Sequence, residues 1–151
     1  MDLQTNNIEG RVRKTTSEEA NKEFDRRILD YIQRYRNMTA SQISGRLLDL
    51  KEEWDIERVL EVNASSLMLA GVLMGKFVNN KWFALSGIVA GFLLQHGLQG
   101  WCPPLPLLRA LGVRTRREID EEVYALKVIR GDFDKITTNS PPELILETLR
   151  S

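Results

Sequence analysis

The fold is decided by residues 62–108, which read VNASSLMLAGVLMGKFVNNKWFALSGIVAGFLLQHGLQGWCPPLPLL. The whole chain of 151 residues has 21 basic and 21 acidic side chains, yet this stretch contains two charged ones, Lys76 and Lys81. A helix that crosses a membrane needs about 20 predominantly apolar residues, with roughly 17 as the lower limit. The stretch therefore predicts two membrane spans, at about residues 62–78 and 82–101. Because the connector between them is very short, the two spans must run antiparallel.

Amphipathic helices are expected before this hairpin. Thr16 with Glu19, and Thr39 with Gln42, have the spacing of capping boxes, in which two side chains satisfy the free N–H groups at a helix start. Apolar residues recur at helical spacing after each box. The two apolar faces comprise Phe24, Ile28, Tyr31, Ile32 and Tyr35 in the first helix, and Ile43, Leu47, Leu50 and Trp54 in the second.

Further helices are expected after the hairpin. Thr115 and Glu118 form a third capping box, and the apolar stripe that follows it ends before Gly131, a typical C-terminal cap. Residues 132–140 are expected to form a loop. A last short helix starts after Ser140, with proline in the first turn, where it is tolerated. No pattern with the period of a β-strand occurs.

The sequence therefore predicts an all-α protein, a membrane helical hairpin with cytoplasmic amphipathic helices on both sides. The expected organisation is a disordered leader at 1–15, a cytoplasmic helical segment at 16–54, a transmembrane hairpin domain at 55–115 and a cytoplasmic helical tail at 116–151. Continuity of a helix from 41 to 78 is left open. Asp55 can cap a new helix, but no proline or glycine there forces the preceding one to stop.

Two pairs of glycines are predicted to bring the two spans together. Gly71 and Gly75 lie four residues apart on the first span, as do Gly87 and Gly91 on the second. Residues equally far from the connector should lie at similar depth, which sets Gly71 level with Ile88. Small residues at such positions let two backbones approach closely, and close packing drives helix association in lipid. We expect both pairs to face the partner helix.

Polar residues are expected to gather at the end of the hairpin away from the connector. The same depth rule sets Asn63 level with His96, with Ser66 and Gln95 nearby. At this depth the lipid interior gives way to the headgroups. We expect the four side chains to bond to one another or to water.

Basic residues predict the orientation of the hairpin. Those near the outer ends of the spans are Arg46, Lys51 and Arg58 on one side, and Arg109, Arg114, Arg116 and Arg117 on the other. The connector region has Lys76 and Lys81. Because loops rich in Lys and Arg stay in the cytoplasm, both termini are expected there. Arg114, Arg116 and Arg117 are expected to signal this topology or to bind anionic lipid headgroups.

The sequence offers little for catalysis or metal binding. His96 is the sole histidine, so the spacing assembles neither a multi-histidine metal site nor a Cys-His dyad with a third, orienting group. Cys102, the sole cysteine, is a candidate reactive thiol if Arg109 activates it. No catalytic residue, cofactor or metal is predicted. The net charge of zero argues against nucleic acid as a partner.

One family resemblance agrees with this interpretation. The segment Gly100-Trp101-Cys102-Pro103, followed by Leu107-Leu108, Leu111-Gly112-Val113 and Thr115, resembles the YgaP-like transmembrane domain family, and Asp55 to Arg58 approximates the acidic-arginine pair at its start. Members are bacterial inner-membrane helical hairpins, largely of unknown function. The resemblance covers about 55–115 and implies an integral inner-membrane protein. Arg116 stands where many members carry a second cysteine, so two-thiol chemistry is not implied.

The expected function is that of a small integral protein of the bacterial inner membrane, acting without catalysis as an anchor or an interaction scaffold. Its expected partners are the lipid bilayer, a second copy of the chain and a cytoplasmic protein. One alternative is a thiol-based sulfur or redox relay through Cys102. The other is a soluble helical adaptor in which the apolar hairpin is buried.

Overall fold

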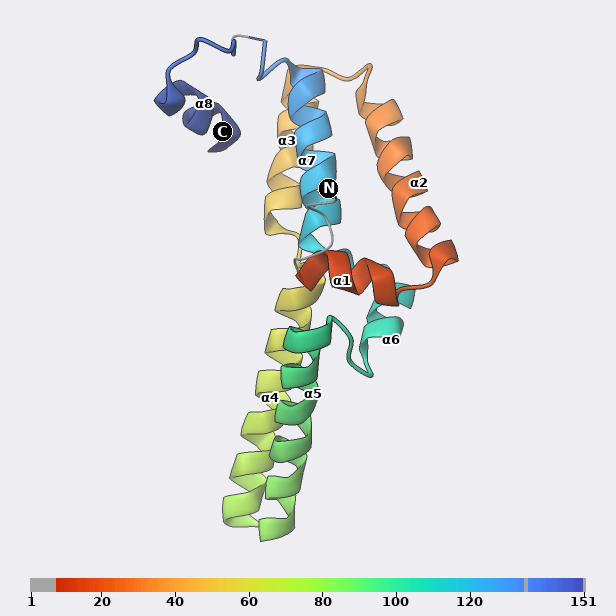
Figure 1. The fold of residues 1–151 in the computed structure, drawn as a ribbon, viewed down its shortest axis with the longest axis vertical. Coiled ribbons are helices and arrows are strands. Elements are labelled where there is room, and N and C mark those ends of the chain that lie inside the picture. The colour runs from red at the N-terminus through yellow and green to blue at the C-terminus, as the bar shows by residue number, and fades with distance from the viewer. Residues whose placement is uncertain (1–7, 135, 151) are drawn as a thin grey trace. The chain divides into compact units, whose positions relative to one another are not determined.

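The computed structural model describes residues 8–134 and 136–150, and these residues form helices and loops without a β-strand (Figure 1). The predicted all-α class is confirmed. The helices are α1 (Ile8–Thr15), α2 (Glu18–Tyr35), α3 (Ala40–Glu52), α4 (Ile56–Phe77), the 3₁₀ turn η2 (Asn80–Trp82), α5 (Phe83–Gln99), α6 (Leu105–Ala110), α7 (Arg116–Arg130) and α8 (Pro142–Arg150).

The described residues form two compact units. The first, here called the hairpin unit, comprises residues 8–25 and 54–118, and the second, the helical unit, comprises residues 26–53, 119–134 and 136–150. Helices α2 and α7 each begin in the hairpin unit and continue into the helical unit.

The long antiparallel helices α4 and α5 form the hairpin that the sequence predicted (Figure 1). Asp55 caps α4, because its Oδ1 accepts the Arg58 N–H at 2.8 Å. The chain leaves the helical conformation between α3 and α4, which answers the open question about 41–78 with two separate helices. At the far end, α5 stops at Gly100, whose φ of 73° is readily adopted by glycine.

Large apolar side chains on the surface of the hairpin are not covered by other parts of the described chain. Ile88 is 57% exposed and Phe92 is 41% exposed, although both are large apolar residues of α5. The stretch Ala40–Phe77, which runs from α3 through the break into α4, contains a window that is long and apolar enough to cross a membrane, and 17% of this window is buried. Helix α5 has 17 residues, the lower limit for a span. A core helix of a soluble protein would be mostly covered, so this exposure favours a membrane hairpin over the soluble-adaptor alternative.

Helix α1 is a correction to the sequence analysis. We expected a disordered leader at 1–15, of which residues 1–7 lie outside the described part, but Ile8–Thr15 forms a helix. Val12 is fully buried and packs against Ile56, Leu60, Cys102 and Leu105. Contacts with distant parts of the chain therefore stabilise a helix that is too short and too polar to be recognised from its own sequence.

The first predicted capping box is also wrong, by one residue. The Thr16 hydroxyl donates to the Val12 carbonyl at 2.8 Å, which closes α1. Ser17 accepts the Ala20 N–H at 3.2 Å instead and caps α2. The Thr39 and Gln42 box is confirmed, as is the box of Thr115 and Glu118.

Two further differences follow from local chain breaks. The prolines at 103, 104 and 106 do interrupt the helix after α5, as expected, but the chain then forms the short helix α6, with proline in its first turn. Trp54, predicted on the apolar face of α3, lies beyond the end of that helix and is 47% exposed. Its ring stacks under the Arg58 guanidinium, 4.3 Å from the ring centroid.

The helical unit has its own apolar core. Helices α3 and α7 lie side by side in Figure 1, and their core consists of Ile43, Leu50, Ile119 and Leu126. These residues come from the apolar faces that the sequence predicted. Arg46 donates to the fully buried Glu122 at 2.9 Å, so an ion pair accompanies the apolar contact.

Candidate functional site

The glycines of α4 bring the two hairpin helices into contact near the connector. A Cβ added to Gly71 would collide with the Ser86 hydroxyl and lie 3.1 Å from the Ser86 backbone nitrogen. A Cβ on Gly75 would lie 2.9 Å from the Phe83 ring. The Ser86 hydroxyl also donates to the Met68 carbonyl at 2.9 Å, across the helix interface. Helix packing through Gly71 and Gly75 therefore has the close approach that the sequence analysis expected.

The second glycine pair does not take part. A Cβ on Gly87 or Gly91 would meet no atom within 4 Å, so the prediction that this pair faces α4 is wrong. The assumption that residues equally far from the connector lie at the same depth also fails. Gly71 lies against Ser86, whereas this assumption set it level with Ile88. Residues Asn80–Trp82 form a 3₁₀ turn, so the connector is not symmetric about its centre.

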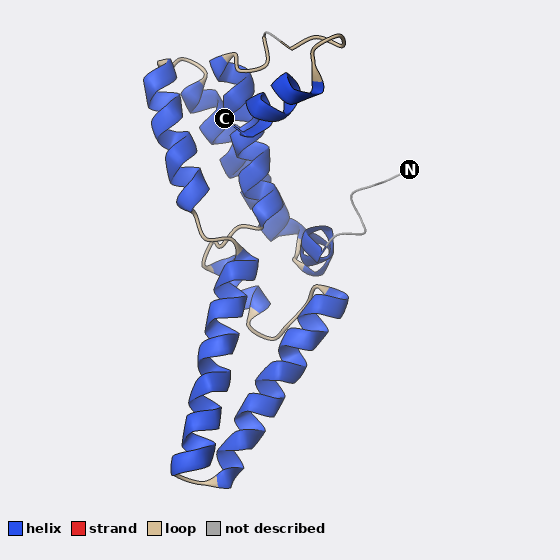
Figure 2. Ribbon diagram, turned by 90° about the vertical axis from the view of Figure 1, so that its left-hand side faces the viewer, coloured by secondary structure: helices blue, strands red, loops and turns tan. Residues whose placement is uncertain are grey.

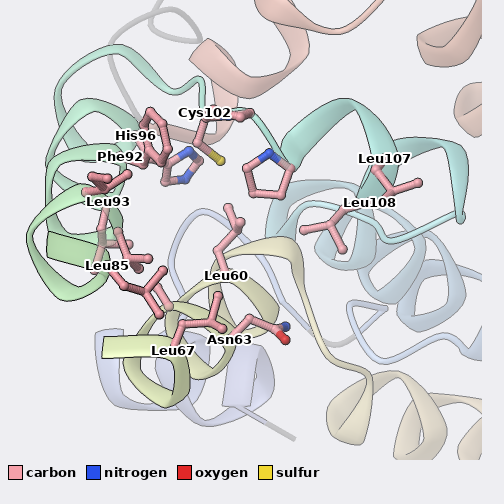
Figure 3. A pocket seen from close by; sticks show the side chains of 15 residues that line it. Leu60, Asn63, Leu67, Leu85, Phe92, Leu93, His96, Cys102, Leu107 and Leu108 are labelled. Atoms are coloured by element: carbon pink, nitrogen blue, oxygen red, sulfur yellow. The ribbon is translucent and has the colours of Figure 1, made fainter. Parts of the chain in front are cut away.

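Away from the glycines, a pocket of about 520 Å³ opens between α4, α5 and α6 (Figure 3). Figure 2 shows the two long helices converging at their connector and diverging toward the other end. Leucines line the pocket on all three helices, among them Leu60 on α4, Leu93 on α5 and Leu108 on α6. Its volume is within the range of small-molecule sites, about 300–1,000 Å³.

A group of polar side chains forms one end of this pocket. The His96 Nε2 and the Glu57 Oε2 are 2.8 Å apart and share a hydrogen bond. His96 is 4% exposed, and it interacts with both Glu57 and the Cys102 thiol. Cys102, 3% exposed, lies beside the His96 ring (Figure 3). The sequence analysis found no third group to orient a Cys-His pair, and the structure supplies Glu57.

The predicted polar cluster is only partly assembled. Asn63 donates to the Val59 carbonyl at 2.7 Å, and Ser66 donates to the Val62 carbonyl at 2.7 Å, so both side chains bond within their own helix. His96 bonds to Glu57, and Gln95 is half-buried. Asn63 and His96 both line the pocket. Asn63 and Ser66 thus bond to backbone carbonyls one turn back and not to each other, and the alternative that the polar side chains bond to water stays a prediction.

A buried charge cluster closes the end of the hairpin unit. The fully buried Glu118 accepts from both terminal nitrogens of Arg109, at 2.7 and 2.8 Å, and from Arg13 at 3.0 Å. The Arg109 guanidinium also stacks 3.8 Å from the centroid of the Phe24 ring. Burial alone would raise the pKa of Glu118, but the hydrogen bonds and charge of Arg109 outweigh it and hold the pKa below its usual value.

This cluster overturns two expectations. Arg109 was the residue expected to activate Cys102, but its guanidinium is bound to Glu118. The sequence-based argument for a thiol relay, in which Arg109 activates Cys102, is therefore not supported by these contacts. Arg114 is 7% exposed, so the headgroup interpretation is wrong for this residue, because a buried guanidinium does not face lipid. Arg116 and Arg117 are half-buried.

The sequence analysis missed Glu57, for which the sequence carried a signal, and missed the burial of Glu118, for which it carried none. Glu57 lies on the same helical face as Leu60, Ala64 and Leu67, and an acidic residue on an apolar face needs a partner. Glu118 was predicted as the partner of Thr115 in a capping box. The structure confirms this capping box. The burial of Glu118 between Arg109 and Arg13 depends on the tertiary structure and could not be predicted from sequence spacing.

The chemistry open to the site follows from these contacts. An imidazole has two ring nitrogens that bond to neighbouring groups, and the thiol beside it is a weak donor. Among the residues that the structure describes, no three His, Cys, Asp or Glu side chains are grouped so that they could hold a metal ion. The pocket wall is mostly apolar, with Asn63, His96 and Cys102 as its polar members.

Comparisons with known proteins agree with this architecture. An uncharacterized protein of Synechocystis sp. is 45% identical over 56 residues, which are 37% of this chain and 31% of that relative. The chain thus matches about a third of the relative's length. No solved structure matches the chain. Residues 55–118 match the family described as inner membrane protein YgaP-like, transmembrane domain. The matched residues are those of the hairpin, from its cap at Asp55 to the buried Glu118 at its end, so the hairpin is similar to the YgaP-like inner-membrane transmembrane domain.

Proposed function

We propose that this protein is a non-enzymatic anchor of the inner membrane. In this proposal the α4 and α5 hairpin crosses the lipid and holds the helical unit at the cytoplasmic surface as an interaction scaffold. The observation that carries it is the uncovered apolar surface of the hairpin, with Ile88 57% exposed. Lipid tails would cover this surface, whereas water would be strongly disfavoured there.

The orientation rests on the basic residues. Seven flank the outer ends of the spans, and the connector region has Lys76 and Lys81, both exposed. Short loops with more Lys and Arg stay on the cytoplasmic side. Both termini are therefore proposed to lie in the cytoplasm and the connector on the opposite side.

Cysteine accessibility tests this orientation. In a Cys102→Ser background, Lys81→Cys is expected to react with a membrane-impermeant maleimide in intact spheroplasts, because the connector faces outward. The matched variant Glu147→Cys, on the exposed surface of α8, is expected to react only after the membrane is permeabilised. The reverse pattern, or labelling of both sites in intact spheroplasts, would contradict the proposed topology.

A second copy of the chain and a cytoplasmic protein are the proposed partners. Gly87 and Gly91 leave open space on α5, and a strip of small residues exposed to lipid allows close approach of another helix. On the helical unit, Tyr124 and Val128 of α7 are 49% and 63% exposed, one turn apart. These two residues are a surface that a cytoplasmic partner would cover.

A further inference from the structure

The hairpin is short for a structure that crosses a membrane. An α-helix rises 1.5 Å per residue, so the 17 residues of α5 extend over about 25 Å. On α4, the stretch without a charged side chain runs from residue 62 to residue 75 and extends over about 20 Å. The hydrocarbon core of a typical bilayer is about 30 Å thick. The apolar part of the hairpin is therefore shorter than such a core by roughly 5–10 Å.

Acidic residues of α4 set the outer end of the apolar part. Glu61 is exposed on the surface of α4, one residue before the uncharged stretch begins. One turn further out, the Glu57 Oε2 bonds to the His96 Nε2 of α5 at 2.8 Å, so both helices place polar groups at this level. A carboxylate surrounded by lipid tails carries a large desolvation cost. The hydrocarbon region must therefore end close to Glu61.

The other end of the apolar part lies close to Lys76. This lysine is exposed, and its Nζ lies 5.5 Å from the centroid of the Phe77 ring, the next residue toward the connector. Asn79 and Asn80 in the connector are exposed as well. Trp82, which precedes α5, is 39% exposed, and indole rings are favoured at the boundary between membrane and water. Polar and interfacial residues thus mark this boundary on both sides of the connector.

The packing of α4 against α5 prevents the hairpin from changing its length. Gly71 lies against Ser86, and the Ser86 hydroxyl donates to the Met68 carbonyl at 2.9 Å, so the register of the two helices is fixed. Tilting would only shorten the extent of the hairpin across the membrane. A span shorter than the local hydrocarbon thickness is accommodated mainly by thinning of the bilayer around it. The lipid must therefore adapt to the hairpin.

We propose that the hairpin prefers phospholipids with short acyl chains, which form a bilayer with a hydrocarbon core of about 20–25 Å. The proposal rests on the anchor function proposed above and names the kind of membrane that the anchor selects. Short chains surround the exposed side chains of α4 and α5 without deformation. Longer chains must compress or tilt beside the hairpin, or else cover Glu61 and Lys76.

Quenching of tryptophan fluorescence by brominated lipids tests this proposal. The full chain is reconstituted into dimyristoleoyl-, dioleoyl- or dierucoyl-phosphatidylcholine mixed with a brominated phosphatidylcholine, and Trp82 and Trp101, which flank α5, report which lipid lies beside the hairpin. We expect the dimyristoleoyl lipid to bind at least about threefold more strongly than the dierucoyl lipid, because the longest chains have the largest mismatch. Equal binding of the three lipids, or strongest binding of either longer one, would overturn the proposal.

A pair of double variants tests whether the two charges set the preferred thickness. Glu61→Leu with Lys76→Leu extends the uncharged part of α4 at both ends, and both positions are exposed. This variant is expected to shift the preference toward dioleoyl-phosphatidylcholine. The matched control, Glu147→Leu with Lys51→Leu, makes the same two exchanges at exposed positions of the helical unit and should leave the preference unchanged. No shift in the first variant, or an equal shift in the control, would contradict the proposal.

The same measurement separates this proposal from the anchor function. Equal quenching by brominated lipids of every chain length would show a hairpin in the bilayer without a preferred thickness, and the proposal alone would fail. If no brominated lipid quenched the fluorescence, lipid tails would not surround the hairpin. The anchor function would then fail together with the proposal.

Discussion

Replacing Glu118 with glutamine is expected to destabilise the hairpin unit by about 3–5 kcal/mol. Glu118 is fully buried and accepts from Arg109 and Arg13. The amide has no charge to balance these guanidinium groups, and the Arg109 side chain is itself 2% exposed. A buried cation without its partner carries the full cost of desolvation. Denaturant unfolding of the protein in detergent micelles measures the change.

The matched control is Glu147→Gln, an identical exchange at an exposed position of α8. Its effect should stay within about 0.5 kcal/mol, because exposed positions of this kind contribute little. Equal stability of the two variants would contradict the assignment of Glu118 as the central acceptor of the charge cluster.

The same carboxylate gives stability a defined dependence on pH. The pKa of Glu118 is lower in the folded protein than its usual value of 4.5. The folded state therefore holds this proton less tightly than the unfolded state, so the stabilisation is fully present above about pH 4.5 and is lost as the pH falls through the folded-state pKa. The Glu118→Gln variant should lack this part of the acid-induced loss.

Replacing Gly71 with alanine is expected to destabilise the hairpin by about 1–3 kcal/mol, the usual cost of overpacking. The new Cβ would lie 3.1 Å from the Ser86 nitrogen and 3.2 Å from the Trp82 carbonyl oxygen. Both are backbone atoms, so relief requires α5 to move away from α4. Thermal unfolding in detergent, monitored by helical circular dichroism, measures the loss.

Gly87→Ala is the matched control on the partner helix. No atom lies within 4 Å of the added Cβ, and alanine is the better helix former by about 1 kcal/mol. Unchanged or increased stability is expected. In the same series, Gly87→Leu should keep the hairpin intact but reduce crosslinking between copies in native membranes. A loss of stability for Gly87→Ala as large as that for Gly71→Ala would contradict the observed packing.

The hairpin itself could be predicted because its signal is a property of the sequence alone. Residues 62–108 contain only two charged side chains, so helices formed by them have no polar face for water. The capping residues Asp55 and Thr115 mark helix starts through local hydrogen bonds. Such features depend on neighbours in the chain. They need no knowledge of the tertiary structure.

Features that depend on distant contacts were missed. Helix α1 is ordered through Val12, whose partners lie more than 40 residues away in sequence. The two glycine pairs look alike in sequence, but Gly71 is packed against Ser86 whereas Gly87 has open space around it, a difference that only the packing of the two helices reveals. The Glu57 and His96 pair joins residues on different helices. Sequence spacing along one helix cannot reveal such a pair.

Alkaline extraction of membranes from cells that express the full chain tests the central claim, that lipid tails surround the α4 and α5 hairpin. Carbonate at high pH strips proteins held by charge or by surface contacts, but it leaves those held by the hydrophobic effect. We predict that the protein stays in the membrane pellet. Its release into the supernatant as a folded species would contradict the account.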